Sequence, residues 1–189
     1  MLLQGHLHGA TIAPVIIASD KTHLSNFSSN KSVWPVYLTI GNIEKSTHRQ
    51  PSAHATVLIS YILVSKIECF SKEKRQYHSY QVFHDCMHSL LAPLKKAGEE
   101  GIDMVCADGF IHWVFPILCA YVADYPKQCL VACNNENHCP WCDAGRTKLG
   151  CPLNTVLKSS ETVLQAMDNA ANGNMDEYTR LGLHPNNPF

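Results

Sequence analysis

The fold of this chain is decided by the stretch TIAPVIIAS, which spans Thr11–Ser19. The stretch is short. Its centre, Val15, Ile16 and Ile17, lies between Pro14 and the polar cluster that follows. Short β-branched runs between such boundaries are typical of buried strands. We therefore expect a buried strand here, with the rest of a sheet built around it.

Two more strands are expected before residue 65. Thr22–Ser32 is a polar loop, after which Trp34–Ile40 alternates well enough for a strand that ends at Gly41. Ala55–Val64 is the third apolar run. Short connections between consecutive strands favour antiparallel pairing. The sequence therefore predicts an antiparallel meander of three strands.

The apolar period changes after this meander. Apolar side chains recur every three or four positions over Ser79–Ala97, which predicts an amphipathic helix with Gly98 as its stop. Ile102–Ala107 predicts a short strand, and Asp108-Gly109 is a hairpin-type turn signal. Ile111–Ala123 is almost wholly apolar, and its period fits either a strand or a helix.

The remainder of the chain is more polar. Glu161–Ala171 predicts one more helix, and Gly182–Phe189 resembles a loop. Three strands, a helix and then another strand is the order of an RNase H-like core, an α/β sheet that begins with antiparallel strands. The same order fits other α/β folds. We expect a core over residues 1–150 that includes a Cys-x-x-Cys loop, and the helical or irregular start of an insertion over residues 151–189.

Composition limits the class of protein. With 189 residues, 46% of them hydrophobic and 16% charged, the chain is globular and has one core. A net charge of −1 argues against a protein held to DNA mainly by electrostatics, so DNA contacts would need local patches. Lys45–Arg49 and Lys66–Arg75 are candidates, although solvated loop charge explains both more simply. Nine cysteines without a secretory signal indicate a reducing compartment, and no apolar run is long enough to span a membrane.

Two aspartates close apolar runs. Asp20 follows the first run, and Asp124 ends the run over residues 111–123 shortly before Pro126 breaks it. Asp20 could also begin a turn or cap a helix. Carboxylates that converge on one sheet edge repel each other unless a divalent cation neutralises them, which suggests Mg²⁺ or Mn²⁺ and two-metal phosphoryl transfer. The rivals Asp85 and Asp108 fit more simply as a helix residue and a turn residue.

Cys139-Pro140-Trp141-Cys142 is the sharpest local motif. A Cys-x-x-Cys loop lets two thiolates hold one Zn²⁺, and the same spacing occurs in redox motifs. A redox pair usually opens a helix after a strand, whereas polar loop surrounds this pair, so zinc is the favoured interpretation. One pair is half a site. Cys129, Cys133 and His138 could complete it, although either of these cysteines could equally be core, or the other ligands could lie beyond Phe189.

His84 and His88 are four residues apart on the predicted helix, with no Glu beside His84 to make a zincin motif. We interpret them as part of a helix face.

Taken together, these residues resemble the Plavaka group of fungal transposases, relatives of the CACTA (EnSpm-like) DDE elements. The resemblance covers roughly residues 9–150, and the combination is specific although no single piece is. Gly182–Phe189 also resembles the family's approach to its next block. The matching stretches are Gly9–Pro14, Ser19–Ser25, Trp34–Ile43, Ala107–Gly109, Phe115–Leu118, Ala123–Pro126, Gln128–Val131 and Cys139–Cys142.

The resemblance implies an RNase H-like fold in which Asp20 is the first catalytic acid and Asp124 the second, both binding Mg²⁺ or Mn²⁺. In CACTA-like enzymes a Cys-x-x-Cys follows the second acid at a similar distance. In the V(D)J recombinase, a more distant relative, that pair joins two later histidines around zinc. By this analogy Cys139 and Cys142 are ligands of a structural zinc.

Two blocks of the family pattern are absent from these residues: the one that supplies a third acid, and an N-terminal DNA-recognition region. We therefore expect this chain by itself to be inactive. The resemblance implies that the partners are DNA, as transposon ends and target, and other copies of the same chain in a homo-oligomer. It implies the nucleus as the location.

Three hypotheses from different classes follow. The first is a transposase catalytic core, and the second is a catalytically dead, domesticated or decayed module that binds DNA or protein through a zinc loop. The third is a thiol–disulfide protein that uses Cys139 and Cys142.

Overall fold

The computed structural model describes residues 9–23, 32–64, 67–148 and 155–184, which form a mixed α/β structure. Two compact units make up the chain. The first consists of Met1–Val64 and Cys86–Val122, and the second consists of Ser65–Asp85 and Ala123–Phe189. The prediction of a core over residues 1–150 and an insertion over residues 151–189 stays a prediction.

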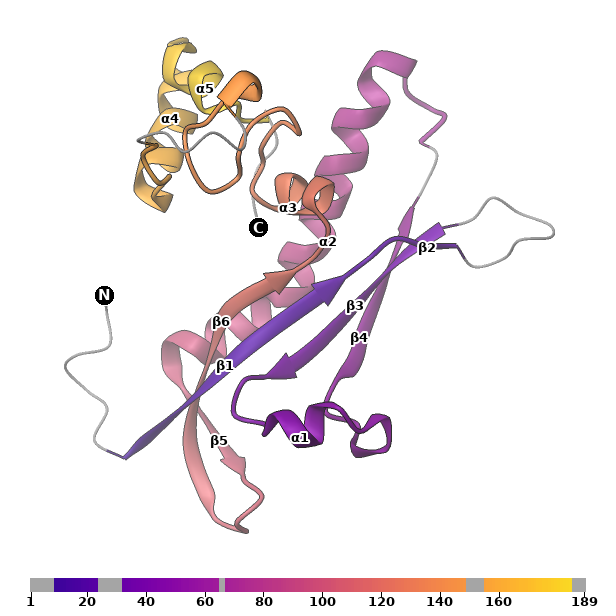
Figure 1. The fold of residues 1–189 in the computed structure, drawn as a ribbon, viewed down its shortest axis with the longest axis vertical. Coiled ribbons are helices and arrows are strands. Elements are labelled where there is room, and N and C mark those ends of the chain that lie inside the picture. The colour runs from indigo at the N-terminus through magenta and orange to yellow at the C-terminus, as the bar shows by residue number, and fades with distance from the viewer. Residues whose placement is uncertain (1–8, 24–31, 65–66, 149–154, 185–189) are drawn as a thin grey trace. The chain divides into compact units, whose positions relative to one another are not determined.

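The first unit is built on one mixed sheet, in the order β2-β3-β1-β6-β5 with β4 also paired to β3. Figure 1 shows β1 between β3 and β6. Pairs β1–β3, β3–β4 and β5–β6 are antiparallel, whereas β1 and β6 are parallel. The strands are β1 (Ala10–Ser19), β2 (Thr22–His23), β3 (Ser32–Ile40), β4 (Val57–Val64), β5 (Ile102–Val105) and β6 (Ile111–Val122).

Strand β1 lies at the centre of the sheet because it carries apolar side chains, which a central strand buries. Val15 and Ile17 are fully buried, as is Val36 on the neighbouring β3. The expected meander is confirmed as β1, β3 and β4. The stretch over residues 111–123, whose period was ambiguous, forms the long strand β6 up to Val122, and Asp108-Gly109 lies in the β5–β6 turn as predicted. The short strand β2 was not predicted, since Thr22 and His23 belong to a polar stretch.

Helix α2 (Lys72–Glu100) connects β4 to the hairpin formed by β5 and β6. Parallel neighbours such as β1 and β6 need a long crossover between them, and α2 lies within that crossover. The helix passes through the expected stop at Gly98 and ends at Glu100, where Gly101 adopts φ +75. Gly98 has a different role: a Cβ there would lie 2.6 Å from the Pro116 carbonyl oxygen, so glycine permits α2 to approach β6 closely.

The second unit is mainly helical. Its core cluster consists of Ala166 on α4 (Ser160–Ala171) with Tyr178, Leu181 and Leu183, and further apolar side chains of α4 pack against this cluster. Lys127 is buried with its ammonium 4.2 Å from the centre of the Phe83 ring, a cation–π contact. The predicted helix over residues 161–171 is confirmed as α4. The helices after β6 are α3 (Tyr125–Val131), η2 (Arg146–Lys148), α4 (Ser160–Ala171) and α5 (Asp176–Leu181).

The short helices were not predicted from the spacing of apolar residues. The segment between β3 and β4 contains α1 (Lys45–His48) and η1 (Pro51–Ala53), and α3 and α5 are also brief. Elements of one or two turns bury too few side chains to produce a recognisable period. Among the helices of the described residues, none combines the length and the apolar character that crossing a bilayer demands.

Candidate functional site

The two aspartates singled out by sequence follow neighbouring parallel strands. The β1–β6 register ends with Ala18 opposite Val122. Asp20 comes two residues after Ala18, and Asp124 comes two residues after Val122. Both aspartates are exposed. Since parallel strands point the same way, the chain leaves the sheet at the same edge before each acid.

Asp124 also has a local structural role. It is the N-cap of α3, with an extended backbone at φ −66 and ψ 164, and its Oδ1 accepts a hydrogen bond of 3.1 Å from the backbone N–H of Lys127. Pro126 lies in the first turn, where its missing N–H is harmless. Asp20, for which a helix-capping role was considered, is followed by strand β2 rather than by a helix. The cap at Asp124 engages one carboxylate oxygen and fixes the direction of the side chain.

A part-buried hydrogen bond joins the ends of β1 and β6 just before the two acids. Ser19 Oγ lies 2.5 Å from Tyr121 Oη, and Ser19 is 2% exposed. Burial raises the pKa of the Tyr121 phenol, and the hydrogen bond with Ser19 opposes this. The phenol is therefore neutral at physiological pH. Sequence reasoning missed this pair, and a lone tyrosine in an apolar run was the only available signal.

The rival acids have structural partners. Asp108 Oδ1 accepts from the Phe110 N–H at 3.0 Å, and Oδ2 pairs with His112 Nε2 at 2.8 Å. These hydrogen bonds, with the Phe110 N–H contributing most, hold the pKa of Asp108 below its ordinary value. Asp85 accepts from Gln81 Nε2 at 2.9 Å within α2. The assignment of both as structural residues agrees with these contacts.

The Cys-x-x-Cys motif forms a closed loop. The Cys139 N–H donates to the Ala144 carbonyl at 3.0 Å, and the Trp141 N–H points at Cys139 Sγ at 3.4 Å. A backbone hydrogen bond from Ala144 is the main cause that lowers the pKa of the Cys142 thiol, with smaller contributions from hydrogen bonds with the Cys139 thiol and with Thr155. Backbone N–H groups aimed at sulfur favour thiolates, the form that binds metals.

The additional ligand candidates lie in less favourable surroundings. Cys129 and Cys133 are buried, and burial raises the pKa of Cys133 to about 12. Cys133 Sγ lies 3.4 Å from Nε2 of His84, which is buried and 3.0 Å from the Leu130 carbonyl. His138 Nδ1 is buried without a hydrogen-bond partner among the residues that the structure describes. Within residues 9–23, 32–64, 67–148 and 155–184, no three His, Cys, Asp or Glu side chains are grouped to hold a metal.

Lys158 ties the cysteine loop to the helices that follow it. Its Nζ donates to Asn134 Oδ1 at 2.8 Å, to the Cys139 carbonyl at 2.8 Å and to the Leu181 carbonyl at 2.7 Å. Burial is the main cause that lowers the pKa of Lys158, and the nearby thiols oppose it.

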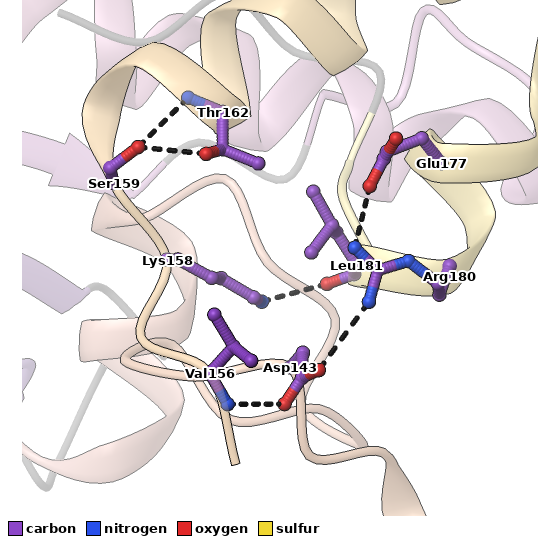
Figure 2. A network of polar contacts seen from close by, with 8 residues as sticks. All are labelled: Asp143, Val156, Lys158, Ser159, Thr162, Glu177, Arg180 and Leu181. Carbon is purple, nitrogen blue, oxygen red and sulfur yellow. Dashed lines mark hydrogen bonds and ion pairs between the residues drawn. The ribbon is translucent and has the colours of Figure 1, made fainter.

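A second set of polar contacts surrounds this lysine. Figure 2 shows Asp143 accepting from the Val156 N–H at 3.1 Å and pairing with Arg180 at 3.4 Å. Arg180 also pairs with Glu177 at 2.5 Å. The loop that carries Cys139 and Cys142 is therefore fixed from two sides by side chains of the second unit.

Comparison with known families gives a match. The family model described as Plavaka transposase covers residues 2–189. No curated protein matches the chain.

Proposed function

This chain belongs to the Plavaka transposase family, and we propose that it carries part of a catalytic core that cleaves and joins DNA strands with the help of divalent metal ions. The observation that carries the proposal is the parallel pairing of β1 with β6, because it brings together the strand ends that precede Asp20 and Asp124. DNA, as transposon ends and target, is the proposed substrate.

The strand order supports an RNase H-like assignment. A meander of β1, β3 and β4, then α2, then β6 parallel to β1, is the order that such a core requires. In this arrangement the acids of a DDE enzyme stand at the ends of adjacent strands. Proposals drawn from family membership alone are a homo-oligomeric assembly and nuclear action, as expected of an enzyme that works on chromosomal DNA.

Asp20 and Asp124 are the proposed ligands of Mg²⁺ or Mn²⁺. Both are exposed, and hard divalent cations prefer carboxylate oxygens. The Lys127 N–H holds one oxygen of Asp124, which orients the carboxylate without neutralising its charge. The chemistry that bound ions supply is activation of the attacking water or 3′-hydroxyl and stabilisation of the leaving oxygen. The role of the chain's own residues is to supply two carboxylates just after the adjacent ends of β1 and β6.

Cys139 and Cys142 are the proposed ligands of a structural Zn²⁺. The donor set fits because backbone N–H groups approach the sulfurs and lower the pKa of Cys142. His138, Cys129 and Cys133 remain proposed additional ligands. The loop also supports the second candidate function, a catalytically inactive module that binds DNA or protein around zinc.

Binding of Mn²⁺ to the full chain, measured by electron paramagnetic resonance, tests the metal proposal. Asp20→Asn and Asp124→Asn should each weaken binding by about tenfold or more, because each removes one ligand charge. Asparagine still caps a helix, so Asp124→Asn keeps the start of α3 intact. Asp108→Asn is the matched control, and its affinity should equal that of the wild type. Equal affinity in all four proteins would refute the site.

The same proteins separate the two candidate functions. Mn²⁺-dependent nicking of supercoiled DNA that disappears in Asp20→Asn would exclude the inactive module. Tight binding of DNA without nicking, unchanged in Asp20→Asn, would favour it.

A further inference from the structure

We infer that Ser19 and Tyr121 are positioning residues that hold the ends of β1 and β6 together, so that Asp20 and Asp124 can share a divalent cation. This inference rests on the proposed function. Neither hydroxyl is assigned a role as a metal ligand, and both act through the strands that carry them.

The register of the sheet explains how these two side chains meet. Tyr121 lies opposite Ile17, and Ser19 is two residues further along β1 on the same face as Ile17. The tyrosine side chain therefore reaches along the sheet, towards the end where the strands stop. Its hydroxyl meets Ser19 Oγ at 2.5 Å, one residue before Asp20 and three residues before Asp124.

The need for such a bond follows from charge. Carboxylates brought to one cation repel each other until the cation binds. The last registered pair of backbones is Ala18 and Val122. Past this pair, the sheet itself no longer holds the strands together. The part-buried hydrogen bond between Ser19, at 2% exposure, and Tyr121 opposes the separation of the two strand ends.

The chain offers a matched control at the opposite end of the same two strands. Thr11 Oγ1 on β1 lies 3.2 Å from His112 Nδ1 on β6, so this is also a side-chain hydrogen bond between β1 and β6. It lies far along the strands from Asp20 and Asp124. A variant at Thr11 therefore shows the effect of losing a side-chain hydrogen bond between β1 and β6 that is not the bond between Ser19 and Tyr121.

The experiment measures Mn²⁺ affinity and thermal stability of the full chain in parallel. Tyr121→Phe and Ser19→Ala should each weaken Mn²⁺ binding by about tenfold. Ser19→Thr keeps a hydroxyl and should restore affinity to within about twofold of the wild type, on the same scale. Thr11→Val should lower the melting temperature as Ser19→Ala does, while its Mn²⁺ affinity stays at the wild-type value.

Three results would overturn the inference, and one of them would overturn the metal site as well. Wild-type Mn²⁺ affinity in Tyr121→Phe and Ser19→Ala, with reduced affinity in Asp20→Asn, would refute the positioning role and leave the metal site standing. Wild-type affinity in Asp20→Asn and Asp124→Asn would refute the metal site and the positioning role together. Equal loss of affinity in Thr11→Val would show a general effect of strand pairing and would also refute the positioning role.

Discussion

Replacement of Lys158 by methionine should loosen the second unit and leave the first unit unchanged. Methionine keeps the apolar stem of the side chain but removes the ammonium group. Three acceptors lose a donor: Asn134 Oδ1, the Cys139 carbonyl and the Leu181 carbonyl, at 2.7 to 2.8 Å. The Cys139 carbonyl retains a hydrogen bond of 3.2 Å from Asn134 Nδ2. Two acceptors are therefore left without the donor that now satisfies them.

The expected loss of stability follows from these two acceptors. A buried acceptor without a donor costs about 1–3 kcal/mol. Lys158 is only half-buried, so water can reach part of the space, and the combined cost should be about 2–4 kcal/mol rather than the full sum. This corresponds to about 30- to 1,000-fold more frequent opening of the second unit, since each 1.4 kcal/mol is a factor of ten.

Hydrogen exchange followed by mass spectrometry is the suitable assay because it reports each unit separately. Peptides over residues 129–144 and 176–184 should exchange faster in Lys158→Met, whereas peptides of β1 and β3 should not change. Lys148→Met is the control, because Lys148 is exposed. Unchanged exchange over residues 129–144, or equal acceleration in β1 and β3, would refute the reasoning.

Three further predictions concern ionisable side chains. The pKa of Asp108 is lowered in the folded chain, so its contribution to the β5–β6 hairpin is present above the unfolded value of 3.8 and is lost as pH falls through the lower folded value. NMR titration of the carboxyl carbon should give a midpoint below 3.8, and a midpoint at or above 3.8 would contradict the hydrogen bonds of the turn. Iodoacetamide at pH 8 should modify Cys142, whose pKa is lowered, well before buried Cys133, whose pKa is about 12. Equimolar Zn²⁺ should protect Cys139 and Cys142 but not exposed Cys119, and equal labelling of all three with zinc present would count against the zinc proposal.

Local patterns in the sequence determined most of the elements. The β-branched run at residues 11–19, the change of period before α2 and the Asp108-Gly109 turn each depend on neighbours a few positions away. For this reason β1, the core of α2, β5 and the turn after β5 were predictable, whereas the period of β6 did not distinguish a strand from a helix. The mixed α/β class followed from their order. The Cys139–Cys142 loop was likewise visible, because its spacing is a local property.

The tertiary structure alone decided which distant residues meet. Ser19 and Tyr121 are 102 positions apart, and no local period relates them. Lys158 looks like any surface lysine in the sequence, yet Asn134, Cys139 and Leu181 surround its amine. Such contacts depend on which strands pair with each other. They also depend on which polar groups become buried, because a buried polar group needs a hydrogen-bond partner. The sequence thus determined most of the elements and the candidate acids, whereas only the tertiary structure showed that the strands preceding Asp20 and Asp124 are parallel neighbours.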